Sequence, residues 1–93
     1  MEEVTTIFKK YREKEMLTMQ ELADALASGS GEIVSVPSVQ QWESGKHIPL
    51  KYIWVKLVLQ TTDWRRDMAL EVLAVLDPAF HTQICDMLQG VSA

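Results

Sequence analysis

Residues 17–49 read LTMQELADALASGSGEIVSVPSVQQWESGKHIP, and the first part of this stretch carries a helix start. Thr18 and Glu21 have the spacing of a capping box, in which the hydroxyl accepts from the Glu21 amide and the carboxylate reaches back to the Thr18 amide. We therefore expect a helix that begins after Thr18 and ends near Ala27. The Ser-Gly-Ser-Gly run at residues 28–31 is typical of a turn.

A second short helix follows in the same stretch. Ser35 is a suitable N-cap, Pro37 sits in the first turn, where a missing N–H costs nothing, and Gly45 suits the C′ position. These signals predict a helix over residues 36–44. Residues 32–34 could form a short extended piece before it. The stretch thus predicts two short helices joined by a turn.

The rest of the chain also carries helix patterns, and strand formers do not alternate over any useful length. Val4, Ile7, Phe8 and Tyr11 recur at the spacing of one helix face. The helices expected outside the central stretch cover residues 4–15, 50–60, 64–76 and 78–89, the last closed by Gly90. We predict an all-α fold of five to six short helices.

The charge of the chain is unevenly distributed. Of the 93 residues, 47% are hydrophobic, so a packed core is expected. The net charge of the chain is −4. Residues 1–66 hold all nine Lys and Arg together with nine acids, so they are neutral, and residues 67–93 carry the whole −4. A neutral domain with a local basic face can bind DNA, whereas the acidic tail would stay away from phosphates or face a partner.

Several classes of protein are disfavoured by what the sequence lacks. The single Cys85 cannot form an internal disulfide, and the acidic N-terminus is unlike a signal peptide. No apolar run approaches the ~20 residues that span a bilayer. We expect a soluble, cytoplasmic protein that does not contact a membrane.

Catalytic and metal-binding patterns are also missing. His47, His81 and Cys85 lack the spacing of metal ligands, and there is no glycine-rich phosphate loop or nucleophile motif. We therefore expect no metal, no cofactor and no catalytic residue. Cys85 is expected to be a small buried hydrophobe. A binding module is favoured over an enzyme fragment or accessory subunit, which has the least support.

The helix over residues 36–44 is polar and rich in amides. Gln40, Gln41 and Ser38 can read base edges, since a glutamine amide suits the N6/N7 edge of adenine. Phosphate contacts are expected from basic residues after the helix and from two helix N-termini: Lys46, His47, Lys51, Thr18 and Ser35. These residues together indicate a DNA-reading surface.

Residues 4–62 resemble a known family, the helix-turn-helix domain shared by phage repressors, Cro proteins and XRE-like bacterial regulators. The most specific match is Trp-Glu-x-Gly-Lys-x-x-Pro, which runs from Trp42 to Pro49. The other matching residues are Arg12-Glu13, Leu17-Thr18, Glu21-Leu22-Ala23, Ser35 and Val39. The resemblance implies a recognition helix over about residues 36–44 that lies in the major groove.

The resemblance also implies roles for single residues. Ser35 would cap the recognition helix, and Arg12 and Glu43 would form an internal ion pair. The residues that fall on or beside the base-contacting face are Val36, Pro37, Ser38, Gln40 and Gln41. Those at phosphate-contacting positions are Ser44 and Lys46, and those at core positions are Leu22, Ala23, Val39 and Trp42.

The sequence departs from the family pattern at three places. The connection from Leu22 to Trp42 is longer by about six residues, which affects the angle between the two helices. Met19 stands where glutamine usually contacts a phosphate, and Gln20 beside it is the expected substitute. Pro37 offers no donor to a base, although it and Val36 can touch a thymine methyl.

Simpler interpretations stand beside these assignments. The two glutamines could be solvated helix residues, and Arg12 and Glu43 could be unrelated surface charges. Lys9, Lys10 and Lys14 are expected to form a solvated helix face. The three tryptophans are expected in the core or an interface: Trp42, Trp54 and Trp64.

Residues 63–93 form a separate region after the helix-turn-helix domain of residues 1–62. Its two expected helices are apolar on more than one side, and a soluble monomer rarely leaves such a surface exposed. We therefore expect a twofold dimer through residues 63–93. A dimer presents two recognition helices about one DNA turn apart, ~34 Å, to a pseudo-palindromic operator.

Two functions from different classes follow. The first is sequence-specific binding of double-stranded DNA by a homodimeric transcriptional regulator that acts as a repressor. The second is a protein-interaction module with the same fold and little or no DNA binding, such as an antitoxin with a toxin as partner. The acidic total charge, the long Ser-Gly turn and Pro37 favour the second.

Overall fold

The computed structural model describes residues 2–47 and 51–91, with side chains for residues 4–47 and 51–90. Within these ranges it has six helices and no strand, which confirms the predicted all-α fold. The helices are α1 (Glu2–Lys14), α2 (Met19–Ser30), α3 (Val36–Ser44), α4 (Lys51–Gln60), α5 (Trp64–Leu76) and α6 (Pro78–Val91). Pro49, the last residue of the family match, and Leu50, the expected first residue of the helix over residues 50–60, lie outside the described ranges.

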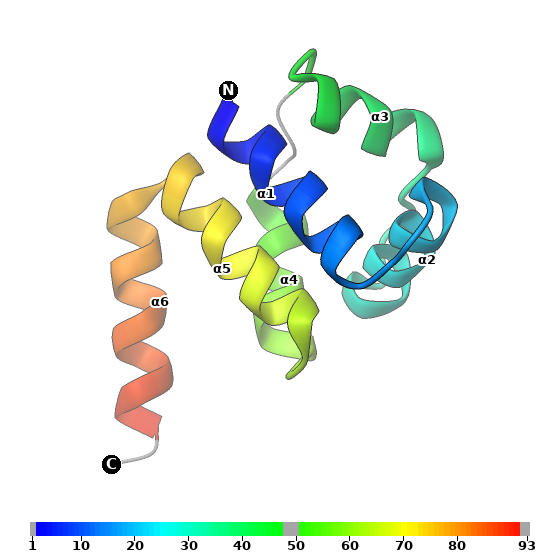
Figure 1. Ribbon diagram of the computed structural model, residues 1–93. Coiled ribbons are helices and arrows are strands. Elements are labelled where there is room, and N and C mark those ends of the chain that lie inside the picture. The colour runs from blue at the N-terminus through cyan, green and yellow to red at the C-terminus, as the bar shows by residue number, and fades with distance from the viewer. Residues whose placement is uncertain (1, 48–50, 92–93) are drawn as a thin grey trace.

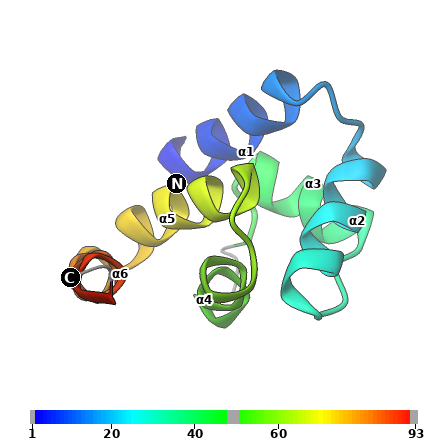
Figure 2. The ribbon, with the colours of Figure 1, turned by 90° about the horizontal axis from the view of Figure 1, so that it is seen from below.

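The helices surround one core. α1 and α5 run side by side, α4 packs behind α5, and α2 and α3 close the opposite side (Figure 1). α6 packs against α5 at the edge of the molecule (Figure 2). The largest fully buried side chains come from α1, α2, α4 and α5: Phe8, Leu22, Leu26, Trp54, Leu57, Met68 and Leu73.

An aromatic cluster joins three of the helices. Phe8 of α1 stacks on Trp42 of α3 at 5.5 Å and meets Trp54 of α4 edge-on at 5.4 Å. The rings of Trp42 and Trp54 are 5.8 Å apart. Aromatic pairs at such distances stabilise by about 0.5–1.5 kcal/mol each beyond their burial. The cluster therefore fixes α3 against α1 and α4.

α2 is longer than its sequence pattern indicates. It ends at Ser30 instead of near Ala27, so the predicted turn over residues 28–30 is wrong. The Ser30 hydroxyl donates to the Leu26 carbonyl at 2.7 Å and accepts from the Glu32 amide at 3.2 Å, so this buried turn has its polar groups satisfied. Gly31, at φ 75°, ends the helix in the left-handed conformation.

α6 also runs past its expected end. Gly90 keeps a right-handed helical backbone and α6 continues to Val91, so the predicted closure at Gly90 is wrong. A glycine is only a favourable stop and not an obligatory one. The other described helix bounds lie within two residues of the expected ones.

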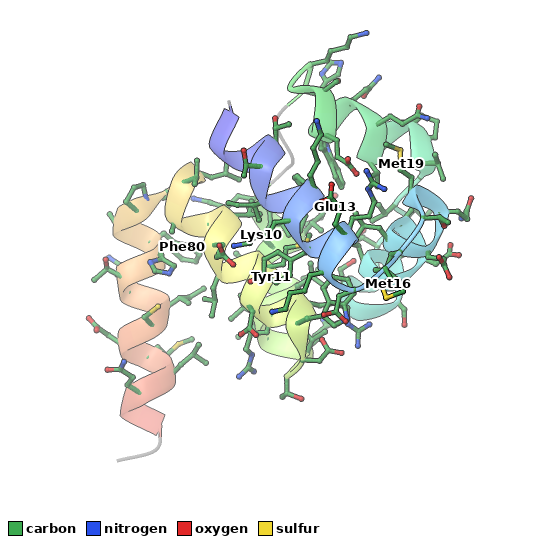
Figure 3. All side chains as sticks on the ribbon, viewed as in Figure 1. Lys10, Tyr11, Glu13, Met16, Met19 and Phe80 are labelled. Atoms are coloured by element: carbon green, nitrogen blue, oxygen red, sulfur yellow. The ribbon has the colours of Figure 1, made fainter. Side chains whose placement is uncertain are left out.

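α5 belongs to the same core as the four helices before it. Its buried residues face α1 and α4: Met68, Ala69, Val72 and Leu73. Lys10 and Tyr11 point from α1 towards α5 (Figure 3), where both donate hydrogen bonds to Glu71. Burial and the Glu71 carboxylate raise the pKa of Tyr11.

No helix in the described part of the chain is long and apolar enough to span a membrane.

Gly29 lies where the added turn of α2 crosses α4. A Cβ built on Gly29 would stand 2.8 Å from Leu57 Cδ2 and 2.9 Å from Thr61 Cγ2. Real side chains do not approach so closely, and Leu57 is fully buried. The close crossing of α2 and α4 therefore requires a residue without a side chain at this position.

We expect Gly29→Ala to lower the free energy of unfolding by about 1–3 kcal/mol, because the added methyl overpacks the α2–α4 contact. The matched control is Gly90→Ala in α6, where a Cβ meets nothing within 4 Å. Alanine is the better helix former, so the control should be neutral or stabilising by up to about 1 kcal/mol. Urea unfolding followed by circular dichroism measures both. Stabilisation by both substitutions would contradict the close crossing.

Candidate nucleic-acid interface

α3 buries one face and exposes the other. Val39, Trp42 and Glu43 are buried, so the side chains between them face outward. The predicted base-reading residues lie on the outer side: Pro37, Gln40 and Gln41 are exposed, and Val36 and Ser38 are half-buried. The side-chain amides of Gln40 and Gln41 make no hydrogen bond to another described residue and are open to a ligand.

The N-terminal end of α3 is capped as predicted. The Ser35 Oγ accepts from the Ser38 amide at 3.3 Å and lies 3.0 Å from the Ser38 Oγ. The two hydroxyls therefore engage each other, and each keeps only its remaining hydrogen-bonding capacity for a base or a phosphate. Pro37 contributes no N–H at this helix end.

The C-terminal end of α3 places Lys46 and His47 on the surface. Gly45 is left-handed at φ 77°, and the amides of Gly45 and Lys46 bond back to Trp42 and Gln41 at 3.3 and 3.0 Å. This closing motif turns the chain sharply, so Lys46 and His47 follow the helix directly and are exposed. Ser44 is exposed, and its hydroxyl donates to the Gln41 carbonyl at 3.1 Å.

Arg12 and Glu43 form the predicted ion pair. Arg12 Nε donates to Glu43 Oε2 at 2.9 Å, and Nη2 donates to Oε1 at 3.1 Å. The Glu43 side chain is only 3% exposed and that of Arg12 is 25% exposed. Such a two-pronged contact fixes orientation as well as distance. It joins α1 to the end of α3 on its inner side.

The start of α2 forms a second edge of the predicted surface. Thr18 and Glu21 make the expected capping box, with hydrogen bonds of 3.1 and 2.9 Å. The Thr18 hydroxyl and amide are therefore used within the cap. Gln20 is exposed and donates to Asp24 at 2.9 Å, which leaves its second amide hydrogen free for a phosphate.

The turn before α2 has a strained backbone. Met16 adopts φ 57°, a conformation that favours glycine, and its side chain is 88% exposed (Figure 3). The amides of Met16 and Leu17 bond back to Glu13 and Arg12 at 3.1 and 2.8 Å. These bonds end α1 and set the entry into α2. Sequence analysis did not identify this feature.

Most basic side chains already have an acidic partner. Lys10 pairs with Glu71, Lys56 with Glu32 and Arg65 with Asp63. Among the described residues, the lysines and arginines without an ion pair or a carbonyl acceptor are Lys9, Lys14 and Lys46. The positive charge beside α3 is therefore small, and Lys46 supplies it.

Lys51 is engaged at the junction of α5 and α6. Its ammonium binds Asp77 at 2.8 Å and lies 5.0 Å from the centre of the Phe80 ring. The hydrogen bond from Lys51 is the main cause of the lowered pKa of Asp77. A phosphate contact by Lys51 would have to break this exposed pair. The basic residues among the predicted phosphate contacts thus fall into two groups, with Lys46 and His47 free and Lys51 engaged.

No described cluster of three or more His, Cys, Asp or Glu side chains could hold a metal ion. His81 Nε2 lies 3.5 Å from Cys85 Sγ on α6, as neighbours one helical turn apart. The site near α3 offers hydrogen bonds, apolar contacts and one lysine charge. Such groups suit recognition of the surface of another macromolecule.

Comparison with protein-family models, with curated proteins and with solved structures finds no match for this chain. The proposals below therefore rest on its own residues and geometry.

We expect Arg12→Ala to lower the free energy of unfolding by about 2–3 kcal/mol, because it leaves the buried Glu43 carboxylate unpaired. The loss is below that of a fully buried pair since Arg12 is partly exposed. The control is Lys9→Ala on the same helix, with an expected change within about 0.5 kcal/mol. Urea unfolding gives both values. Equal small losses would show that the pair contributes nothing to stability.

Proposed function

We propose that this chain binds double-stranded DNA as a homodimeric transcriptional regulator, with α3 in the major groove. The observation that carries the proposal is the outer face of α3, where the amides of Gln40 and Gln41 are exposed and unengaged. The aromatic cluster and the Arg12–Glu43 pair hold the opposite face. A rigid helix with free amide groups has the form that reading of base edges requires.

The proposed mechanism is occupancy of an operator. Gln41 would donate and accept with an adenine edge, while Lys46 and the N-terminal amides of α2 would hold phosphates and fix the register of α3. The bound protein would repress by covering the site where transcription begins. No bond is made or broken.

The dimer would form through α6 together with α4. The apolar stripe of α5 is used in the chain's own core, so the surface left in residues 63–93 belongs to α6. A groove of about 220 Å³ lies between α4 and α6, lined by Val55, Leu59, Phe80, Gln83, Ile84 and Met87. Leu59 and Met87 are 57% and 50% exposed.

Charge and direction support a twofold pairing at this groove. The lining contains no charged side chain, so no charge would face its own copy across the axis. α6 runs away from the end of the molecule where α3 lies (Figure 1). A twofold axis along α6 would leave both α3 helices on the same side, as two half-sites require.

The second candidate is a protein-interaction module, such as an antitoxin that binds a toxin. It is favoured by the absence of lysine and arginine from residues 36–44 and by the pairing of most other basic side chains. An uncharged exposed face suits a protein partner as well as base edges. Binding to DNA fragments decides between the two candidates.

The test of DNA binding is selection from a random pool of duplex DNA at low and physiological salt, followed by fluorescence anisotropy on the enriched sequence. We expect affinity to fall with salt, by a slope of about −0.9 in log K per phosphate contact. Absence of binding even at low salt would contradict the proposal and favour the interaction module.

Substitutions on α3 and after it should have different effects. Gln41→Ala should weaken binding to the enriched sequence by about 1–3 kcal/mol and leave scrambled DNA unchanged, because it removes a base contact. Lys46→Ala should weaken both alike and reduce the salt slope by about one contact per protomer. The control is Gln60→Ala, an exposed glutamine at the end of α4. Equal losses of affinity from Gln41→Ala and Lys46→Ala, on the enriched sequence and on scrambled DNA alike, would contradict these roles.

The dimer surface is tested by a charge placed in the groove. We expect Met87→Asp to convert the dimer to a monomer, because the two-fold axis would bring the new carboxylates together in an apolar interface. Met16→Asp is the control, since it adds the same charge at another exposed methionine away from the groove. Sedimentation equilibrium measures both. A dimer that survives Met87→Asp would exclude this surface.

A further inference from the structure

Ile33 is the most exposed large apolar side chain described in the molecule. It is 96% exposed and lies in the connection between α2 and α3. Leaving an isoleucine side chain in water forgoes the stabilisation that burial would give. A single exposed apolar residue is ordinary on a protein surface, so its position and its neighbours decide whether it has a role.

The neighbours of Ile33 hold it in this orientation. Val34 is 8% exposed and belongs to the core, and the Glu32 carboxylate forms an ion pair with Lys56 of α4. The Glu32 amide also donates to the Ser30 hydroxyl at 3.2 Å. Because both adjacent residues are tied to the body of the protein, Ile33 is presented outward from a fixed backbone.

Ile33 stands beside the end of α3 that would meet the bases. It precedes Val36 by three residues, so their Cα atoms are at most about 11 Å apart. Residues at the N-terminal end of a recognition helix contact base edges in a major groove about 12 Å wide. Ile33, the half-buried Val36 and the exposed Pro37 are thus the apolar residues at and just before the N-terminal end of α3, which we call its apolar tip, and they precede Gln40 and Gln41 in the chain.

The chemistry of this tip and of α3 is selective among base pairs. Aliphatic side chains pack against the thymine 5-methyl group, and glutamine amides match adenine N6 and N7. Guanine is read chiefly by arginine or lysine, and residues 33–44 contain neither. The exposed groups therefore match both bases of an A·T pair and lack the usual contact to a G·C pair.

We propose that the surface formed by Ile33 and α3 reads A·T base pairs, with Ile33 against a thymine methyl group. This inference rests on the proposed DNA-binding function and adds the class of operator. It assigns a specificity role to a residue in the lengthened α2–α3 connection, which would then extend the reading surface beyond the recognition helix.

The experiment removes the methyl group and the isoleucine separately and together. Duplexes of the enriched sequence are made with thymidine throughout, or with deoxyuridine, which lacks only the 5-methyl group, in place of the one thymidine per half-site whose replacement weakens binding most. Their dissociation constants are measured by fluorescence anisotropy for the unmodified protein, for Ile33→Ala and for the control Met16→Ala. Circular dichroism verifies that the variants are folded, which the exposure of both side chains leads us to expect.

We expect the enriched half-site to be rich in A·T pairs and the deoxyuridine duplex to bind the unmodified protein about tenfold more weakly. Ile33→Ala should bind thymidine DNA about tenfold more weakly and lose most of its sensitivity to deoxyuridine. Met16→Ala should behave as the unmodified protein. This non-additive result would place Ile33 and the methyl group in one contact.

Three results would overturn the inference while DNA binding stands. They are a half-site dominated by G·C pairs, equal affinity for thymidine and deoxyuridine DNA, and a deoxyuridine penalty that Ile33→Ala leaves unchanged. Absence of salt-sensitive binding to any duplex would instead overturn the proposed function together with the inference. In that case Ile33 would be an anchor for a protein partner.

Discussion

The contact on which this fold depends is the packing of Phe8 between Trp42 and Trp54. Three aromatic rings from α1, α3 and α4 meet within 5.8 Å of one another, and the rings of Phe8 and Trp54 are fully buried. A short helix such as α3 is only marginally stable alone in water. Its position therefore comes from this cluster and from the adjacent Arg12–Glu43 pair, which together leave the opposite side of α3 free.

The pairing of charges shapes what that free side can recognise. Acidic residues engage Lys10, Lys51, Lys56 and Arg65, so these positive charges are used within the protein. The face of α3 is left with amides, hydroxyls and aliphatic groups. Binding by such a face depends more on shape and hydrogen bonds than on net charge, which is consistent with a chain of net charge −4.

The segment from residue 28 to residue 35 is divided between two structures. Part of it extends α2 by a buried turn that crosses α4 at Gly29, and the remainder forms the segment that carries Ile33. The ion pair of Glu32 with Lys56 ties this segment to α4. These residues are thus packed against the body of the protein, and α3 keeps a fixed place relative to α2.

Local signals in the sequence determined the helices, the caps at Thr18 and Ser35, the closure of α3 at Gly45 and the outward position of Gln40 and Gln41. These features depend on residues within a turn or two of each other, so spacing alone reveals them. The pairing of Arg12 with Glu43 came from the family resemblance, and the structure has it. The turn predicted from the Ser-Gly-Ser-Gly run is wrong because this stretch forms a helical turn that packs against α4, which lies far along the chain.

Only the tertiary structure decided which groups remain free. It buries the α5 stripe and opens the α4–α6 groove, engages Lys51 with Asp77, and exposes Ile33 between two anchored neighbours. Each of these outcomes depends on the distance between residues that are remote in sequence. The sequence pattern indicates which interactions a side chain is able to make, and the packing of the helices determines which of them remain available.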